Sequence, residues 1–474
     1  MLIGIFRIRF IPPLHLVFCF VLTSSPPLAS TFAGQSLEVG VAVRDVTPPV
    51  PYRMSGYFSE RVSTGIRDPL QAKAIVFRQS QASAALVFCD LIGISRDVSH
   101  AARRSASKRS GIPYENIAII ATHSHTGPLY FGALRKMLHD RSVATLGTDP
   151  YETTDYSAEL VEHLVQVIEQ AQRALAPSAL ASGSCELQGL SFNRRFFMKD
   201  GTVRFNPGQL NPEIVRPCGP IDPEVTVIAF QKVKEAQPFA GLSSFALHLD
   251  TVGGTEYSAD YPRFVEEHLR ESFGSQFHSL FGTGTCGDIN HIDVSTSTRP
   301  STEEIGKRLG QHVEACLRDE LAIDSTRLAV RSRSVEVPLQ VYSPEEISEA
   351  ASTLSELGLR KIAFLDSVKA YKIMALQLRG GATIQLEVQV FQLGDETAIV
   401  TLPGEVFVEF GLAIKQASPF KRTLVIELAN DAPGYIPTQK AFVEGSYETV
   451  NSRIATGGGE AMVKLAIEML RELK

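Results

Sequence analysis

Strand-like and helix-like segments alternate along almost the whole chain, and no linker rich in proline, glycine or serine separates them. Short apolar runs bounded by turn residues indicate strands, and apolar positions with a helical period indicate amphipathic helices. The runs at 72–77 and 83–88 are close enough to form a hairpin, whereas residues 155–175 carry an apolar stripe. We therefore predict an α/β fold of mixed α+β type, with layered, partly antiparallel sheets covered by helices in a single large domain.

The same criteria place the remaining elements along the chain. Further strands are predicted at residues 37–43, 117–120, 225–230, 241–249, 328–337, 383–393, 397–402 and 423–428. Helices are predicted near residues 97–110, 261–272, 302–320, 344–357 and 459–473. With 44% hydrophobic residues, the chain can bury a full core.

The N-terminus has the residue order of a secretory signal peptide. Arg7 and Arg9 precede an apolar stretch at residues 14–22, and small residues follow as far as Ala33. This apolar stretch is too short, and its surroundings too rich in proline, to span a bilayer. We therefore predict that residues 1–33 form a leader that is cleaved off, and that residues 34–474 form the mature domain. A secreted or periplasmic protein with no stable membrane span after removal of the leader is therefore expected.

Charge and cysteine content narrow the class of protein. The formal net charge of −6 and the lack of a basic cluster argue against nucleic acid as a partner. Beyond Cys19 in the predicted leader, five of the six cysteines remain; because five is odd and no CxxC pair occurs, they do not form a disulfide scaffold, although one or two bridges stay open. The oligomeric state is not determined by the sequence.

Residues 121–128, Ala-Thr-His-Ser-His-Thr-Gly-Pro, are the stretch most indicative of chemistry. They follow a short apolar run, and residues two apart in an extended chain point to the same side. His123 and His125 would therefore leave the strand end together, as in a metal site or an acid–base pair. The alternative is a loop that happens to carry two histidines.

Short motifs spread over most of the chain support the first interpretation. They lie at residues 45–49, 68–73, 122–128, 193–194, 245–248 with 258–260, 287–288, 403–405, and 430–438 with 447–448. In this order they resemble the catalytic domain of the neutral/alkaline non-lysosomal ceramidases, zinc amidases that cleave the N-acyl bond of ceramide. The resemblance implies a lipid or small-molecule N-acyl substrate and one Zn²⁺ per chain, which polarises the amide carbonyl and activates water.

Carried over by motif, the resemblance implies that zinc is held by His123, His248, Glu405 and Tyr435. Imidazole and carboxylate donors fit zinc on chemical grounds as well. Taken singly, each residue has another interpretation. His248 would be a hydrogen-bonded core histidine, Glu405 a carboxylate at the start of a helix over 405–416, and Tyr435 a packing aromatic.

The resemblance also places His125, Arg194 and Tyr447 as catalytic groups that face the scissile amide. An imidazole can move a proton, and arginine or tyrosine can donate hydrogen bonds to a developing oxyanion. Arg194 has the alternative of a salt-bridge residue, and His125 that of orienting the ligands.

Asp288 and Asn290 are expected to bind substrate, and here the chain departs from the family. Asn290 stands where these ceramidases carry a serine, and the immunoglobulin-like C-terminal domain of well-known members is not expected. The sequence predicts an exported zinc-dependent amidohydrolase of the neutral ceramidase type, which forms a fatty acid and an amine. The alternatives are the same scaffold acting on another amide or ester, for example on a glycan or peptide, and a non-catalytic lipid- or glycan-binding relative.

Overall fold

A large mixed sheet forms one layer of the protein. The computed structural model describes residues 37–474, except residues 236, 320–321, 324 and 357–359, so the predicted leader lies outside the described residues. The sheet has nine strands. Their order is β14 (His278–Thr283), β12 (Ala240–Phe245), β11 (Glu224–Lys232), β6 (Ala176–Glu186), β1 (Glu38–Asp45), β3 (Gln71–Gln79), β4 (Ala82–Cys89) and β5 (Ile117–Ala121), with β16 (Ala322–Ile323) paired to β6. Only the outer pairs β12–β14 and β4–β5 are parallel among these neighbours.

A second sheet packs against the inner face of the first. It has the order β17 (Leu328–Pro338), β18 (Thr383–Leu393), β19 (Thr397–Thr401) and β21 (Arg422–Ile426), and only β19–β21 is parallel. One buried cluster joins the two sheets, because it contains Phe77 and Leu242 from the first together with Phe391 and Leu424 from the second. The core between the sheets is therefore entirely apolar at these positions.

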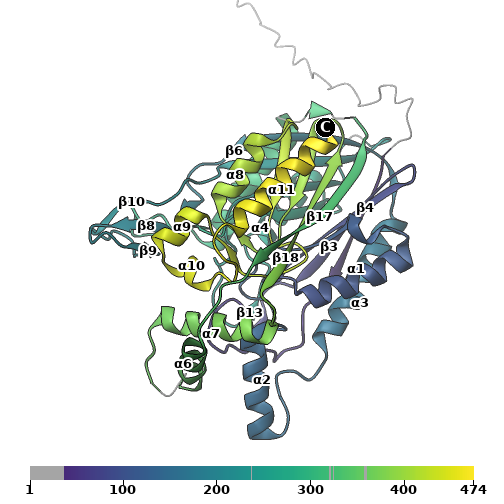
Figure 1. Ribbon diagram of the computed structural model, residues 1–474. Coiled ribbons are helices and arrows are strands. Elements are labelled where there is room, and N and C mark those ends of the chain that lie inside the picture. Colours follow the sequence, from purple (N-terminus) through teal and green to yellow (C-terminus); the bar gives the residue numbers. More distant parts are fainter. Residues whose placement is uncertain (1–36, 236, 320–321, 324, 357–359) are drawn as a thin grey trace, which may run out of the picture. The chain divides into compact units, whose positions relative to one another are not determined.

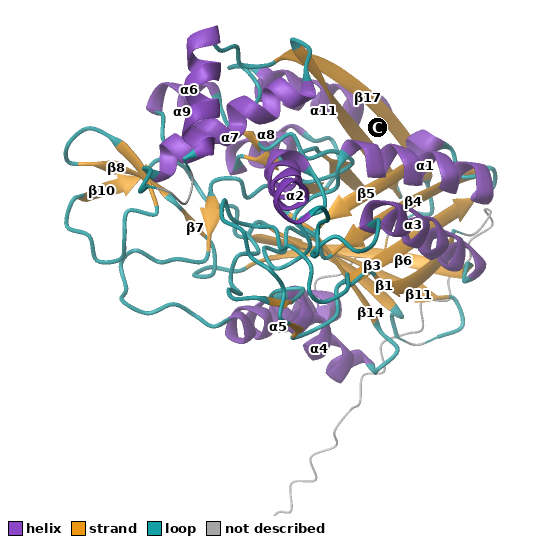
Figure 2. Cartoon of the chain, turned by 90° about the horizontal axis from the view of Figure 1, so that it is seen from below, coloured by secondary structure: helices purple, strands orange, loops and turns teal. Residues whose placement is uncertain are grey.

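Helices cover the two outer faces, as Figures 1 and 2 show. The first sheet is covered by α1 (Arg96–Ser110) and α3 (Tyr156–Arg173) on one half and by α4 (Pro262–Phe273) and α5 (Thr302–Asp319) on the other. The second sheet is covered by α8 (Val408–Ala417) and α11 (Gly458–Leu473). The predicted fold of layered, partly antiparallel sheets under helices is confirmed.

Smaller elements surround the ends of the strands. A group of helices lies beyond one end of the sheets in Figure 1: α2 (Gly132–Leu146), α6 (Pro344–Ser355) and α7 (Phe364–Arg379). Short strand pairs are β2 (Gly65–Ile66) with β13 (Glu256–Tyr257), β7 (Phe192–Asn193) with β15 (Ile289–Asn290), and β20 (Glu405–Val406) with β22 (Tyr435–Ile436). The remaining elements are β8 (Arg195–Met198), β9 (Val203–Phe205), β10 (Ile214–Pro217), the 3-10 turn Tyr114–Asn116, α9 (Gln439–Glu444) and α10 (Tyr447–Asn451).

Most predicted elements agree with the structure to within a few residues, and two differences matter for the site. The strand predicted at 241–249 ends at Phe245, because the backbone turns and Leu247 N donates to the Phe245 carbonyl. His248 therefore lies in a loop. The helix considered for 405–416 begins only at Val408, and Glu405 belongs to a two-residue strand.

Among the described helices, none combines the length and the apolar character that crossing a membrane requires.

Candidate metal centre and substrate cavity

The four residues expected to hold zinc lie where strands of the two large sheets end. His123 follows β5 and His248 follows β12, so both imidazoles come from the first sheet. Glu405 and Tyr435 follow β19 and β21 of the second sheet and pair with each other in β20–β22. Each sheet thus contributes two donors to one place.

Two glycines allow the segments of Glu405 and Tyr435 to approach each other. Gly404 and Gly434 have φ angles of 79° and 86°, which L side chains rarely adopt. A Cβ atom on Gly404 would lie 2.6 Å from the carbonyl oxygen of Gly434. The Pro-Gly that precedes each donor in the sequence therefore permits this pairing.

The donor atoms of these residues converge. His123 Nε2 lies 3.1 Å from His248 Nε2 and 3.5 Å from Glu405 Oε2. The side chain of Tyr435 is hydrogen-bonded to Glu405. His123, His248 and Tyr435 are buried, and the Glu405 side chain is only 15% exposed. The structure thus brings together all four residues that the sequence singled out.

Backbone carbonyls fix the orientation of both imidazole rings. His123 Nδ1 contacts the Ile92 carbonyl at 2.7 Å, and His248 Nδ1 contacts the Cys286 carbonyl at 3.4 Å. A carbonyl only accepts hydrogen bonds, so each Nδ1 is the protonated nitrogen and each Nε2 is left with a lone pair. This is the arrangement in which histidines ligate metals.

The donor set fits zinc. Two lone pairs at 3.1 Å repel each other, but nitrogens bound to one tetrahedral zinc lie about 3.3 Å apart. Burial alone would raise the pKa of Glu405, yet positive charge at the His123 imidazole lowers it to about 2, and a cation held between these residues would favour the ionised carboxylate in the same way. Nitrogen, carboxylate and phenol donors without a thiolate are consistent with a catalytic rather than a structural zinc site.

His125 stands beside this cluster with both ring nitrogens free. Its ring centre is 4.9 Å from that of His123 and 5.1 Å from that of His248. Neither nitrogen has a hydrogen-bond partner among the described residues, and burial lowers its pKa to about 4. Ligand atoms of the three histidines lie within 4.8 Å of one another, so His125 is placed either to move a proton or to ligate.

The expected closeness of His123 and His125 is confirmed, but not through the alternation of an extended strand. β5 ends at Ala121, and His123 has a φ angle of 80°. The pair is held by backbone hydrogen bonds from His123 N to Leu91 and from His125 N to Leu249.

Arg194 and Tyr447 lie around Tyr435 in different roles. Arg194 is buried, and it donates to Tyr435 Oη at 3.1 Å, to the Gly287 carbonyl at 2.7 Å and to Glu448 at 2.9 Å. Its guanidinium therefore orients Tyr435, a candidate ligand, and also forms a salt bridge with Glu448, the alternative role considered from the sequence. Tyr447 lines a cavity next to the donor cluster, with its ring centre 5.4 Å from that of Tyr435.

Asp288 and Asn290 are buried, and neither is among the described residues that line the cavity. Asp288 accepts from Val408 N at 2.9 Å, which caps the first turn of α8, and burial raises its pKa to about 6. Asn290 donates to Asn206 Oδ1 at 2.7 Å and accepts from Ile292 N. Both side chains support the loops behind the site, and their contact with substrate stays a prediction.

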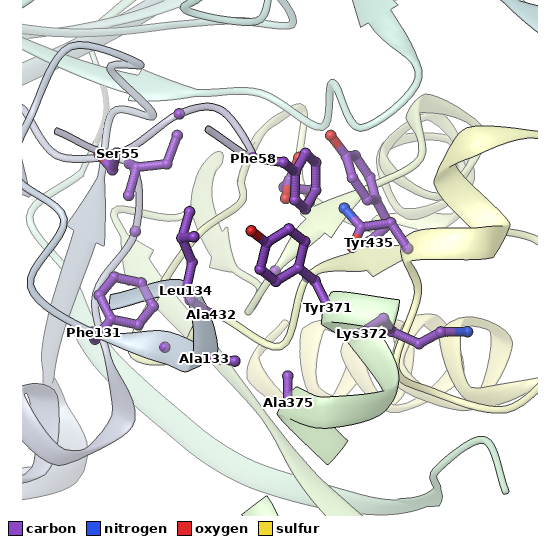
Figure 3. Close-up of a pocket in the computed structure, with 18 of the residues that line it drawn as sticks. Ser55, Phe58, Phe131, Ala133, Leu134, Tyr371, Lys372, Ala375, Ala432 and Tyr435 are labelled. Atoms are coloured by element: carbon purple, nitrogen blue, oxygen red, sulfur yellow. The ribbon is translucent and has the colours of Figure 1, made fainter. Parts of the chain in front are cut away.

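A cavity opens above the donor cluster and continues between α2 and α7. Its volume is about 210 Å³. His123, His125 and Glu405 line its inner end, and its walls are mainly apolar. In Figure 3, Phe131 and Leu134 face Tyr371 and Ala375 across this space. The arrangement offers a polar centre next to an apolar channel.

The sequence did not predict the residues of α2 and α7 that line this apolar channel. α2 buries only Leu138 within the protein, so it has no apolar stripe that would reveal it as a helix. α7 was missed as well, although the run Phe364-Leu365 precedes apolar positions with helical spacing. The buried Arg195–Glu448 ion pair was also missed, since only the fold brings these residues together.

Fold and site together define a mixed α/β protein with a buried histidine, glutamate and tyrosine cluster beside an apolar channel. The sequence profile of the neutral/alkaline non-lysosomal ceramidases, N-terminal part, matches residues 37–258. Over these residues the chain is similar to this family.

Individual relatives agree with this assignment. The chain is 27% identical over 346 residues to the neutral ceramidase of Pseudomonas aeruginosa, a match covering 67% of this chain and 48% of that protein. It is 26% identical over 281 residues to the neutral ceramidase of Mycobacterium tuberculosis, covering 52% of this chain and 41% of that protein. The chain therefore spans about half the length of the curated relatives it matches.

The fold has solved counterparts. The crystal structure of neutral ceramidase from Pseudomonas aeruginosa superposes with a TM-score of 0.69 over 93% of this chain and 74% of that chain, at 21% identity. A structure described as ceramidase complexed with C2 gives a TM-score of 0.68 over 93% and 75% of the two chains, at 20% identity.

Proposed function

We propose that this protein is an exported zinc-dependent amidohydrolase that cleaves the N-acyl bond of ceramide or a related N-acyl lipid. The observation that carries the proposal is the convergence of His123, His248, Glu405 and Tyr435 at the inner end of a largely apolar channel. A polar centre that binds an amide and an apolar wall that binds an acyl chain are the two parts such a substrate requires. Export rests on the predicted leader.

The side chains around the centre have distinct tasks in hydrolysis. Zinc at this position would polarise the amide carbonyl and make water more acidic. A carbon–oxygen bond forms and the carbon–nitrogen bond breaks, so one proton must pass from the attacking water to the leaving nitrogen. His125 is neutral, has two free nitrogens and lines the cavity, which suits it to this transfer. Tyr447, which lines the cavity, would donate a hydrogen bond to the substrate.

The proposal is tested with metal-free protein and with protein reloaded with one equivalent of zinc. Each is assayed on a long-chain ceramide, a short-chain N-acyl amide and the matching ester. Zinc-dependent release of fatty acid and amine from the ceramide is the expected result. Faster turnover of the ester or of a non-lipid amide would assign the scaffold to another acyl bond. Tight ceramide binding without turnover would indicate that the protein is a non-catalytic lipid-binding relative.

Asn290→Ser is expected to change substrate preference without creating activity. The asparagine bridges Asn206 and Ile292 N, and serine can keep only part of this bonding. The loss of one buried hydrogen bond is worth about 1–3 kcal/mol, so relative kcat/KM values should shift by roughly 5- to 150-fold. Kinetics on the same panel check this. An inert wild type together with an active variant would instead identify a degenerate hydrolase.

Ala375→Phe is expected to shorten the acyl chain that the protein accepts. Ala375 lines the channel on α7, and a phenyl ring there would occupy space that a long chain needs. kcat/KM for long acyl chains should fall by about 10- to 200-fold, while short chains are affected little. Met374→Phe, on the same helix but not lining the cavity, serves as the control. Equal losses for all chain lengths would place the acyl group elsewhere.

A further inference from the structure

A buried polar cluster lies behind the candidate metal centre, on the side away from the cavity. Its members are Thr283, Cys286 and Glu427, and all three are fully buried. None of them lines the cavity or was expected from the sequence to act in the site. Glu427 lies one residue beyond β21, and the other two lie at and beyond the end of β14.

The Glu427 carboxyl group contacts one residue next to Glu405 and one residue next to His248. Glu427 Oε2 accepts from Val406 N at 2.6 Å, and Val406 directly follows Glu405. Glu427 Oε1 accepts from the Cys286 thiol at 3.1 Å. The Cys286 sulfur and carbonyl oxygen lie 3.8 Å and 3.4 Å from His248 Nδ1. One carboxyl group therefore links the strand that carries Glu405 with the residue that orients His248.

The same cluster extends to the third candidate ligand. Glu427 N donates to the Thr283 carbonyl at 3.0 Å, and Thr283 Oγ1 donates to the Thr122 carbonyl at 2.7 Å, one residue before His123. Tyr435 is connected to the same cluster because it pairs with Glu405 in the β20–β22 strand pair. Every candidate ligand is thus connected to Glu427 through a short series of hydrogen bonds.

A carboxyl group is an expensive choice for this position if only stability counts. Burial raises the pKa of Glu427 well above its usual range, so the ionised form is strongly disfavoured. An apolar side chain of similar size would avoid the cost of burying the carboxyl group, but it would leave the buried Val406 N–H without an acceptor. The carboxyl group instead fixes the relative position of two segments, because one oxygen binds Val406 N and the other binds the Cys286 thiol.

We propose that Glu427 is a positioning residue for the metal centre, which holds Glu405 and His248 at the spacing that zinc binding requires. This inference rests on the proposed function, because it assumes that these residues bind zinc. Outer partners of this kind orient the ligands, and their loss weakens metal binding by about 10- to 100-fold.

The test is a zinc titration against a fluorescent chelator, combined with thermal unfolding of the metal-free proteins. Glu427→Leu removes both contacts and should weaken zinc binding about 10- to 100-fold. Glu427→Gln keeps an acceptor for Val406 N, so its loss should be smaller. Cys286→Ala, which removes only the thiol, should also lose less than Glu427→Leu. Glu266→Gln is the control, because Glu266 is a buried glutamate on α4 paired with Lys73.

A positioning role requires that zinc affinity falls while the metal-free Glu427→Gln and Cys286→Ala proteins unfold close to the wild-type temperature. Wild-type zinc affinity in all Glu427 and Cys286 variants would overturn the proposal, as would losses that only follow the folded fraction. A wild type that binds no zinc would overturn the metal centre and this inference together. A wild type that binds zinc but hydrolyses no amide would overturn only the proposed activity.

Discussion

Replacing His248 by alanine is expected to abolish zinc binding and, with it, hydrolysis. His248 presents Nε2 to His123 at 3.1 Å, and its Nδ1 is fixed by the Cys286 carbonyl, so its Nε2 lone pair points at the proposed metal position. Removal of a ligand should weaken zinc binding by more than about 100-fold, beyond the range for residues that only orient ligands. Elemental analysis of the purified variant and an amide hydrolysis assay measure both effects.

The matched control for this experiment is His268→Ala. His268 lies on α4 and pairs with Glu314 at 2.7 Å, away from the strand ends that form the site. This variant should retain one equivalent of zinc and nearly full activity. Zinc occupancy that remains high in His248→Ala would show that this histidine is not a ligand.

His125→Ala is expected to lose activity by about 10²- to 10⁴-fold while it keeps most of its zinc, which is the range of a general acid–base contribution. The physical reason is that His125 has two unpartnered nitrogens in the cavity and is not needed to complete the set of four donors. Zinc content and turnover must be measured on the same preparation.

The distances also allow the opposite outcome for His125. The three histidines are close enough to share one metal ion, and His125 would then replace Tyr435 or Glu405 as a ligand. In that case zinc content and activity would fall together in His125→Ala. Tyr435→Phe would then retain zinc, which makes this variant a useful companion.

The sequence was most informative where a short motif carries its own geometry. The Pro-Gly that precedes Glu405 and Tyr435 marks two turns, and the structure confirms that these turns bring both side chains together. The strand before His123 was equally recognisable, because it is a short, fully apolar run. Local patterns therefore located these segments, whereas the set of four candidate ligands was implied by the resemblance to the neutral/alkaline ceramidases.

Other parts of the site depend on contacts between distant segments, which single-sequence patterns do not reveal. α2 has a weak apolar face, because only Leu138 is buried and only its first three residues line the cavity. The proposed role of Glu427 depends on the position of β20, which pairs with β22 and places Val406 N next to the Glu427 carboxyl group at the end of β21. Asp288 is a motif residue whose role at the N-terminal end of α8 was not expected, because only the fold brings it to Val408 N; its contact with substrate stays a prediction.

The origin of the four donors has a consequence for how the protein folds. His123 and His248 extend from one sheet, Glu405 and Tyr435 from the other, so neither sheet alone possesses a complete binding site. A metal ion that binds only the native arrangement stabilises it in proportion to the logarithm of the metal concentration. Under the proposed function, assembly of the two sheets and zinc binding are linked equilibria, and added zinc should raise the free energy of unfolding.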